Sequence, residues 1–125
     1  MNDNVNENKL KDVFSEIEYK GNVYPLYFNL NVMEEIQNEY GTFDNWTDLV
    51  SGKDKTKEVD IKALKFGFKS MINEGIEIKN EDEGTDIKPF TDKQIGRLIT
   101  EIGLMTANQK LIDTVVESTK STKNA

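Results

Sequence analysis

Four glycines divide the middle of the sequence into short amphipathic stretches, and this spacing limits what the chain can fold into. Gly41, Gly52, Gly75 and Gly103 each follow a stretch in which apolar residues recur at helical spacing. Glycine is favoured just after the end of a helix because it reaches left-handed backbone conformations without steric cost. The sequence therefore predicts several short helices joined by tight turns, rather than an extended sheet.

The chain before Gly41 predicts a hairpin followed by a helix. Residues 15–29 alternate apolar and polar side chains on both sides of a turn at 20–22, which is typical of two antiparallel strands. Pro25 cannot donate a hydrogen bond to a neighbouring strand, so its strand is expected at an edge of the sheet. Asn31 is the expected N-cap of the following helix, and Glu34 stands where a capping-box partner belongs.

Two helices are expected in the middle of the chain, over residues 43–51 and 61–74. The apolar stripe of the second is expected to face the core and consists of Ile61, Leu64, Phe68, Met71 and Ile72. Gly67 lies inside this helix, where it costs about 1 kcal/mol relative to alanine, so another backbone is expected to pass close to it. Residues 76–90 are expected to form an acidic loop.

Two more helices are expected after that loop. Thr91 and Gln94 form a capping box for a helix that ends at Gly103. The narrow apolar face of this helix is expected to be buried and consists of Ile95, Leu98, Ile99 and Ile102. Thr106 is the expected cap of a last helix over residues 107–119.

These elements predict one mainly α-helical domain of about five short helices with one small N-terminal β-hairpin, at the margin of the α+β class. A length of 125 residues suits a single domain. Its expected extent is residues 15–119, between a flexible N-terminal segment over 1–14 and a flexible C-terminal tail over 120–125. No apolar run approaches the roughly 18 residues of a membrane span, and the polar, acidic start of the chain is unlike a signal peptide.

The chain contains no cysteine and no histidine. Thiol nucleophiles, imidazole bases and ordinary zinc sites are therefore excluded. The phosphate-binding pattern G-x-x-x-x-G-K-[ST] is also absent. The acidic residues of 76–90 lack the spacing of a calcium loop. We therefore expect no enzyme activity, no catalytic residue, no cofactor and no metal.

Acidic residues dominate the charge of the chain, whose formal net charge is −7. This charge disfavours nucleic acid as a partner, because phosphate binding needs a basic surface. No basic residue occurs over 23–52. Within that stretch, Glu34, Glu35 and Glu39 of the first helix are expected to form an acidic patch that steers a basic partner. The alternative is an ordinary solvated helix face.

A few aromatic residues stand apart from the predicted core stripes. Phe66 on the 61–74 helix, with Tyr24 and Tyr27 on the hairpin, are candidate contacts for a partner protein, and the alternative is packing within their own domain. Trp46 shares a face with other apolar residues and is expected in the core. The stripe at residues 115–116 is expected either in the core or at a surface for weak self-association.

A set of packing and capping residues runs through most of the chain. Its first part consists of Asn31, Glu35, Ile36, Tyr40, Gly41, Phe43 and Trp46. Two further segments, residues 61–75 and 90–99, carry a helix with an internal glycine and a capping box. Together, over about residues 17–117, they resemble the tail assembly chaperones of long-tailed phages and prophages from low-GC Gram-positive bacteria.

This resemblance implies a non-enzymatic assembly factor that works in the host bacterial cytoplasm and is absent from the mature virion. It implies two partners. The first is the tape measure protein, the long and largely helical ruler of the tail, which such chaperones keep soluble. The second is the tail tube protein, which polymerises around the tape measure protein.

Two other functions stay open at this point. A small acidic phage protein that regulates or inhibits a host protein would also use the acidic stretch over 23–52. A structural tail completion subunit would need a large, permanent interface. Helix caps and apolar stripes are common to all three classes of protein and do not distinguish them.

Overall fold

The computed structural model describes residues 14–52 and 58–120, and its fold is mainly α-helical with one small hairpin, as the sequence predicts. Strands β1 (Phe14–Tyr19) and β2 (Asn22–Tyr27) pair antiparallel. Five helices follow, α1 (Leu30–Tyr40), α2 (Phe43–Ser51), α3 (Ile61–Glu83), α4 (Asp92–Ile102) and α5 (Leu104–Lys120). The expected flexible ends lie outside the described residues, except that Phe14 belongs to β1 and Lys120 to α5.

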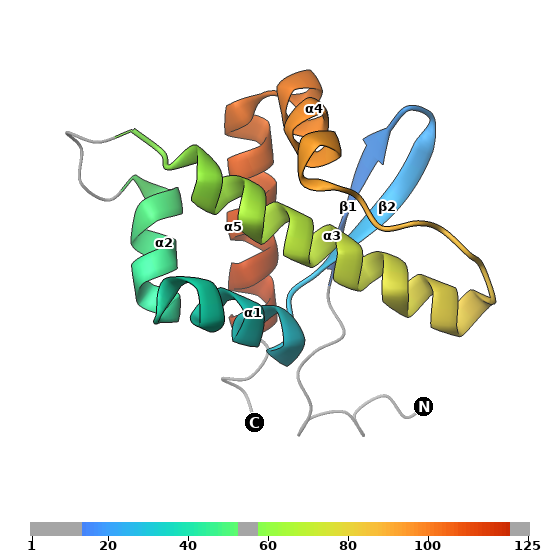
Figure 1. Ribbon diagram of the computed structural model, residues 1–125, viewed down its shortest axis with the longest axis horizontal. Coiled ribbons are helices and arrows are strands. Elements are labelled where there is room, and N and C mark those ends of the chain that lie inside the picture. Colours follow the sequence, from blue (N-terminus) through green and yellow to red (C-terminus); the bar gives the residue numbers. More distant parts are fainter. Residues whose placement is uncertain (1–13, 53–57, 121–125) are drawn as a thin grey trace.

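Helix α3 crosses the whole molecule and contacts every other helix and β2 (Figure 1). Helix α5 runs behind α3, and the hairpin lies beside the C-terminal half of α3. One continuous core surrounds α3, and its largest fully buried side chains include Trp46, Phe68, Leu26, Leu64 and Leu111. No helix in the described part of the chain is long and apolar enough to cross a membrane.

The core position predicted for Trp46 is confirmed. Its ring is fully buried, and its indole Nε1–H donates to the carbonyl oxygen of Ala63 at 3.0 Å. The same ring explains Gly67, because a Cβ atom there would overlap the indole. The expectation of a close backbone at Gly67 was therefore wrong: a side chain from α2 fills the space.

The predicted end of α3 at Gly75 was also wrong, and the close backbone lies here instead. The helix continues to Glu83 and is capped by Gly84, so residues 76–83 are helical and the loop covers only 84–91. A Cβ atom at residue 75 would overlap the carbonyl oxygen of Pro25 in β2. The glycine is needed for close packing of strand on helix, rather than to end the helix.

Two of the predicted helix starts were wrong: the cap of α1 lies two residues earlier than expected, and α5 begins three residues earlier than expected. Asn29, not Asn31, caps α1, since its Oδ1 accepts the backbone N–H of Val32 at 3.2 Å. Helix α5 begins at Leu104, because the carbonyl oxygen of Gly103 already accepts the backbone N–H of Ala107 at 2.9 Å. By contrast, the capping box at the start of α4 is confirmed, and both of its hydrogen bonds are present.

Candidate functional site

Two grooves of opposite character flank α3. The first, which we call the acidic groove, lies against α1 and has a volume of about 460 Å³. It is lined by Glu35, Glu39, Phe66, Lys69, Glu74, Glu77 and Asp92, together with three other polar residues. The second, the apolar groove, lies against α4 and the start of α5 and has a volume of about 880 Å³. It is lined by Ile61, Leu64, Lys65, Lys93, Gly96, Arg97, Ile99, Thr100, Glu101 and Leu104.

The acidic groove gathers three of the six candidate partner contacts. Glu35 and Glu39 reach it from α1, and Phe66 reaches it from α3. Phe66 is half-buried and packs edge-on against Tyr40, with 5.6 Å between the ring centroids. Glu34 is exposed and lines neither groove. The acidic patch predicted on α1 is therefore divided between a groove and an open helix face.

The other two candidates lie on the hairpin, away from both grooves. Tyr24 is half-buried and meets the ring of Phe90 edge-on, with 5.0 Å between the centroids. Tyr27 is half-buried beside Pro25 and Ile78 in a separate small pocket. The structure thus places both tyrosines where the hairpin packs against α3 and the loop before α4.

Hydrogen bonds from the chain itself occupy several carboxylates of the acidic groove. The hydroxyl of Ser70 donates to Glu35. The side-chain amides of Asn29 and Asn31 donate to Glu74 at 2.8 and 3.2 Å. These bonds join the start of α1 to α3. The acidic groove is therefore partly a seam that holds two helices together.

Tyr40, the last residue of α1, packs against Phe66 of the acidic groove. Burial raises the pKa of its phenol above the ordinary tyrosine value, and the negative charges of Asp60 and Glu39 raise it further. The Tyr40 hydroxyl is buried and has no hydrogen-bond partner among the residues that the structure describes. Tyr40 thus stays neutral at physiological pH and contributes an apolar ring to the wall beside Phe66.

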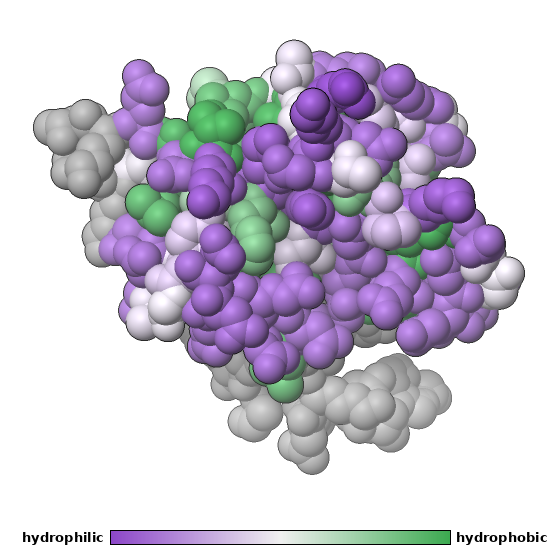
Figure 2. Space-filling model, in the orientation of Figure 1, coloured by the Kyte–Doolittle hydropathy of each residue, from purple (hydrophilic) through white to green (hydrophobic). Residues whose placement is uncertain are grey.

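The apolar groove carries hydrophobic side chains that remain exposed. Leu64 and Ile99 are buried at its floor, whereas Ile61 is 50% exposed and Leu104 is 42% exposed at its walls. Met105, next to Leu104, is 85% exposed. Figure 2 shows a continuous hydrophobic area on this face, where the first turns of α3 approach the start of α5.

This groove corrects one prediction and adds residues that the sequence reasoning missed. Ile61 belongs to the predicted core stripe of α3, but it is the first residue of the helix and is half exposed. Leu104 and the basic residues of the rim were not among the candidates. One signal was available, since Lys93, Arg97 and Glu101 are spaced four residues apart and so share one face of α4.

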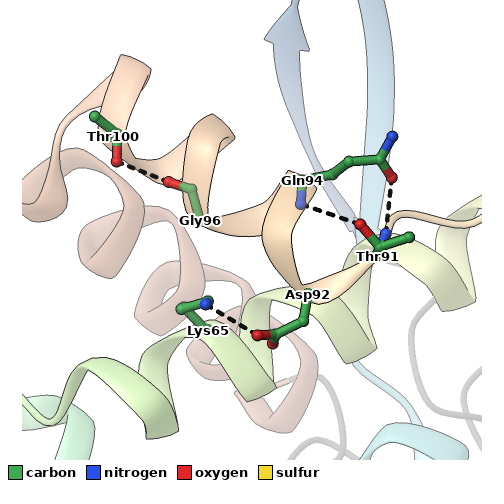
Figure 3. Close-up of polar contacts among 6 residues, drawn as sticks. All are labelled: Lys65, Thr91, Asp92, Gln94, Gly96 and Thr100. Atoms are coloured by element: carbon green, nitrogen blue, oxygen red, sulfur yellow. Dashed lines mark hydrogen bonds and ion pairs between the residues drawn. The ribbon is translucent and has the colours of Figure 1, made fainter.

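A single ion pair separates the two grooves (Figure 3). The ammonium of Lys65 on α3 lies 3.0 Å from Oδ2 of Asp92, the first residue of α4. The hydrogen bond from Lys65 holds the pKa of the Asp92 carboxyl below its usual value. Lys65 lines the apolar groove and Asp92 lines the acidic groove, so the pair neutralises one charge of each.

Within residues 14–52 and 58–120, no group of three or more acidic side chains is placed to hold a metal ion. Comparison of the chain with models of known protein families, with curated proteins and with solved structures gave no match.

Proposed function

We propose that this protein is a phage tail assembly chaperone, which binds the tape measure protein in the host cytoplasm and leaves before the virion is complete. The observation that carries the proposal is the apolar groove, with Ile61 and Leu104 exposed at its walls. Contiguous exposed apolar surface on a small protein is typical of a protein-binding site. A groove between helices suits the apolar face of another helix, and the tape measure protein is largely helical.

The resemblance over residues 17–117 supports the same proposal and supplies the identity of the partners. The tail tube protein is expected to displace the chaperone as it polymerises around the tape measure protein. Because the tape measure protein is long, the two grooves can act on different segments of it. The negative charge of the acidic groove then attracts basic segments of the tape measure protein over a long range, and the apolar groove binds an apolar segment in direct contact.

The test is co-expression with the tape measure protein encoded in the same phage genome. We expect a clear rise in the soluble yield of the tape measure protein when this chain is present. The double variant Ile61→Ser, Leu104→Ser should lose most of that rise. The matched control is Val23→Ser, Leu30→Ser, since Val23 and Leu30 are also large, exposed apolar residues and lie outside the groove.

Four outcomes would contradict the proposal or redirect it. A tape measure protein that is equally soluble without this chain would contradict the chaperone function. Equal loss of tape measure solubility with both double variants would show that the apolar groove has no specific role in the chaperone function. Detection of this chain in purified virions would favour the alternative of a tail completion subunit, and capture of a host protein by the acidic groove alone would favour an acidic regulator.

A further inference from the structure

The floor and walls of the apolar groove set the shape of what can bind there. Buried Leu64 and Ile99 form the floor, and the half-exposed Ile61 and Leu104 also line the groove. The groove is open to solvent and holds about 880 Å³. A convex strip of apolar side chains would fill it, and one face of an α-helix presents such a strip.

The charged side chains at the rim of the apolar groove determine which side chains can flank the apolar strip of a bound helix. Lys93 and Arg97 lie one turn apart on α4, and neither forms an ion pair with any residue that the structure describes. Lys65 is already paired with Asp92. Arg97 is the only arginine of the chain, and its guanidinium can bind a carboxylate through two parallel hydrogen bonds.

This local positive charge runs against the net charge of −7. We infer that the apolar groove binds an amphipathic helix that carries carboxylates beside its apolar face, with those carboxylates paired to Lys93 and Arg97. Glu101, one turn further along α4, lines the same groove and repels a third carboxylate there. The sequence of two cations and one anion therefore favours one direction of the bound helix over the other.

Other occupants fit less well. The acidic groove of a second copy has the complementary charge, but it is concave like the apolar groove, so the two surfaces cannot interlock. Nucleic acid requires many phosphate contacts from basic residues, and this rim offers two unpaired cations. This inference rests on the proposed function for the identity of the partner, since the tape measure protein would supply the acidic amphipathic helix.

The experiment uses the full chain and two designed peptides, each a labelled helix of three heptads with Leu at positions a and d. One peptide carries Glu at the flanking positions, and the other carries Lys there. Fluorescence anisotropy at low ionic strength measures both affinities. We expect the Glu-flanked peptide to bind about tenfold more tightly, as close charge pairs can provide. The net charge of −7 on the chain would by itself favour the Lys-flanked peptide.

Two kinds of variant locate the binding. Charge reversal, Lys93→Glu with Arg97→Glu, should invert the preference between the peptides. Gly96→Leu should weaken both peptides about tenfold by filling the groove, because a Cβ atom at residue 96 meets only the end of the Lys65 side chain, at 3.5 Å. The control Glu35→Lys, Glu39→Lys reverses the same number of charges in the acidic groove and should leave the preference for the Glu-flanked peptide unchanged.

Tighter binding of the Lys-flanked peptide by the unaltered chain would overturn the inference, and so would equal effects of the two charge reversals. Peptide-dependent dimerisation of this chain would point to a second copy as the occupant and would overturn it as well. The solubility assay is separate from the peptide assay. A failed peptide preference with intact solubilisation overturns only this inference, whereas failed solubilisation overturns the proposed function and leaves the peptide result standing.

Discussion

The acidic groove and the apolar groove lie on two sides of α3 and use their polar groups in different ways. In the acidic groove, Glu35, Glu74 and Asp92 accept hydrogen bonds from donors of the same chain. In the apolar groove, Lys93 and Arg97 form no ion pair within the described part of the chain, and Ile61 and Leu104 remain exposed. The difference separates two kinds of surface: carboxylates bonded within the chain hold helices together, and solvent-exposed cations beside exposed apolar area leave a surface open to a partner.

The largest effect should come from the floor of the apolar groove. Ile99→Ala is expected to lower the free energy of unfolding by about 2–4 kcal/mol, because a buried isoleucine leaves a cavity behind. Ile61→Ala, on the wall, should cost less than about 0.5 kcal/mol, since Ile61 is half exposed. Chemical denaturation of both variants provides the measurement. A loss below about 0.5 kcal/mol for Ile99→Ala would show that this residue is not part of the core.

Two glycines inside helices should respond to alanine in opposite directions. Gly67→Ala is expected to destabilise the protein by about 1–3 kcal/mol, because the new Cβ overlaps the buried Trp46 ring, which its bond to Ala63 holds in place. Gly96→Ala is expected to stabilise it by about 0.5–1 kcal/mol, because alanine is the better helix former and the groove has room. Thermal unfolding checks both, and the same sign for both variants would contradict the contrast between core and groove.

These helices also show how far local sequence signals extend. The capping box of Thr91 and Gln94 and the buried face around Trp46 were predictable, because both depend on residues within one or two helical turns. The role of Gly75 inside α3 depends on its close approach to the carbonyl oxygen of Pro25, fifty residues earlier in the chain. The hydrogen bonds from Asn29 and Asn31 to Glu74 likewise join residues more than forty positions apart, which no local pattern indicates.

The candidate site was less predictable than the fold for the same reason. Glu35, Glu39 and Phe66 were identified as separate candidates, but their meeting in one groove requires the packing of α1 on α3. Ile61 carries the pattern of a core residue, but at the first position of α3 it stays half exposed. Helical spacing indicates which side chains share a face, but it does not indicate which part of that face a neighbouring helix covers.

A smaller effect tests whether the acidic groove is structural. Glu74→Ala should lower the free energy of unfolding by about 1 kcal/mol, because the amides of Asn29 and Asn31 lose their charged acceptor. Glu77→Ala, an exposed carboxylate of the same groove, is the control and should stay within about 0.5 kcal/mol. Equal losses in urea denaturation would mean that the hydrogen bonds of Glu74 do not hold α1 against α3.

The ion pair between the grooves should produce a small dependence of stability on pH. The pKa of Asp92 is lowered in the folded state by its hydrogen bond from Lys65, so the folded state binds this proton less readily than the unfolded state. The stabilisation is therefore present above the ordinary aspartate pKa of about 4 and is lost as the pH falls through the lower, folded value. Asp92→Asn should remove it, making stability less sensitive to acid, whereas Asp86→Asn serves as the exposed control. An identical acid dependence in both variants would contradict a role for the pair.

The smallest effect concerns the acidic patch on α1 and the rate of encounter with the tape measure protein. Replacing Glu34, Glu35 and Glu39 by Gln should lower the association rate less than about tenfold, because long-range attraction of basic segments acts on encounter. The Gln at position 35 still accepts the hydrogen bond from Ser70, so the fold is kept. Neutralising the three acids at 81–83 removes the same charge at the far end of α3 and is the control. Stopped-flow association at low and moderate salt gives the rates, and an equal decrease for both triple variants would show that net charge, rather than this patch, governs encounter.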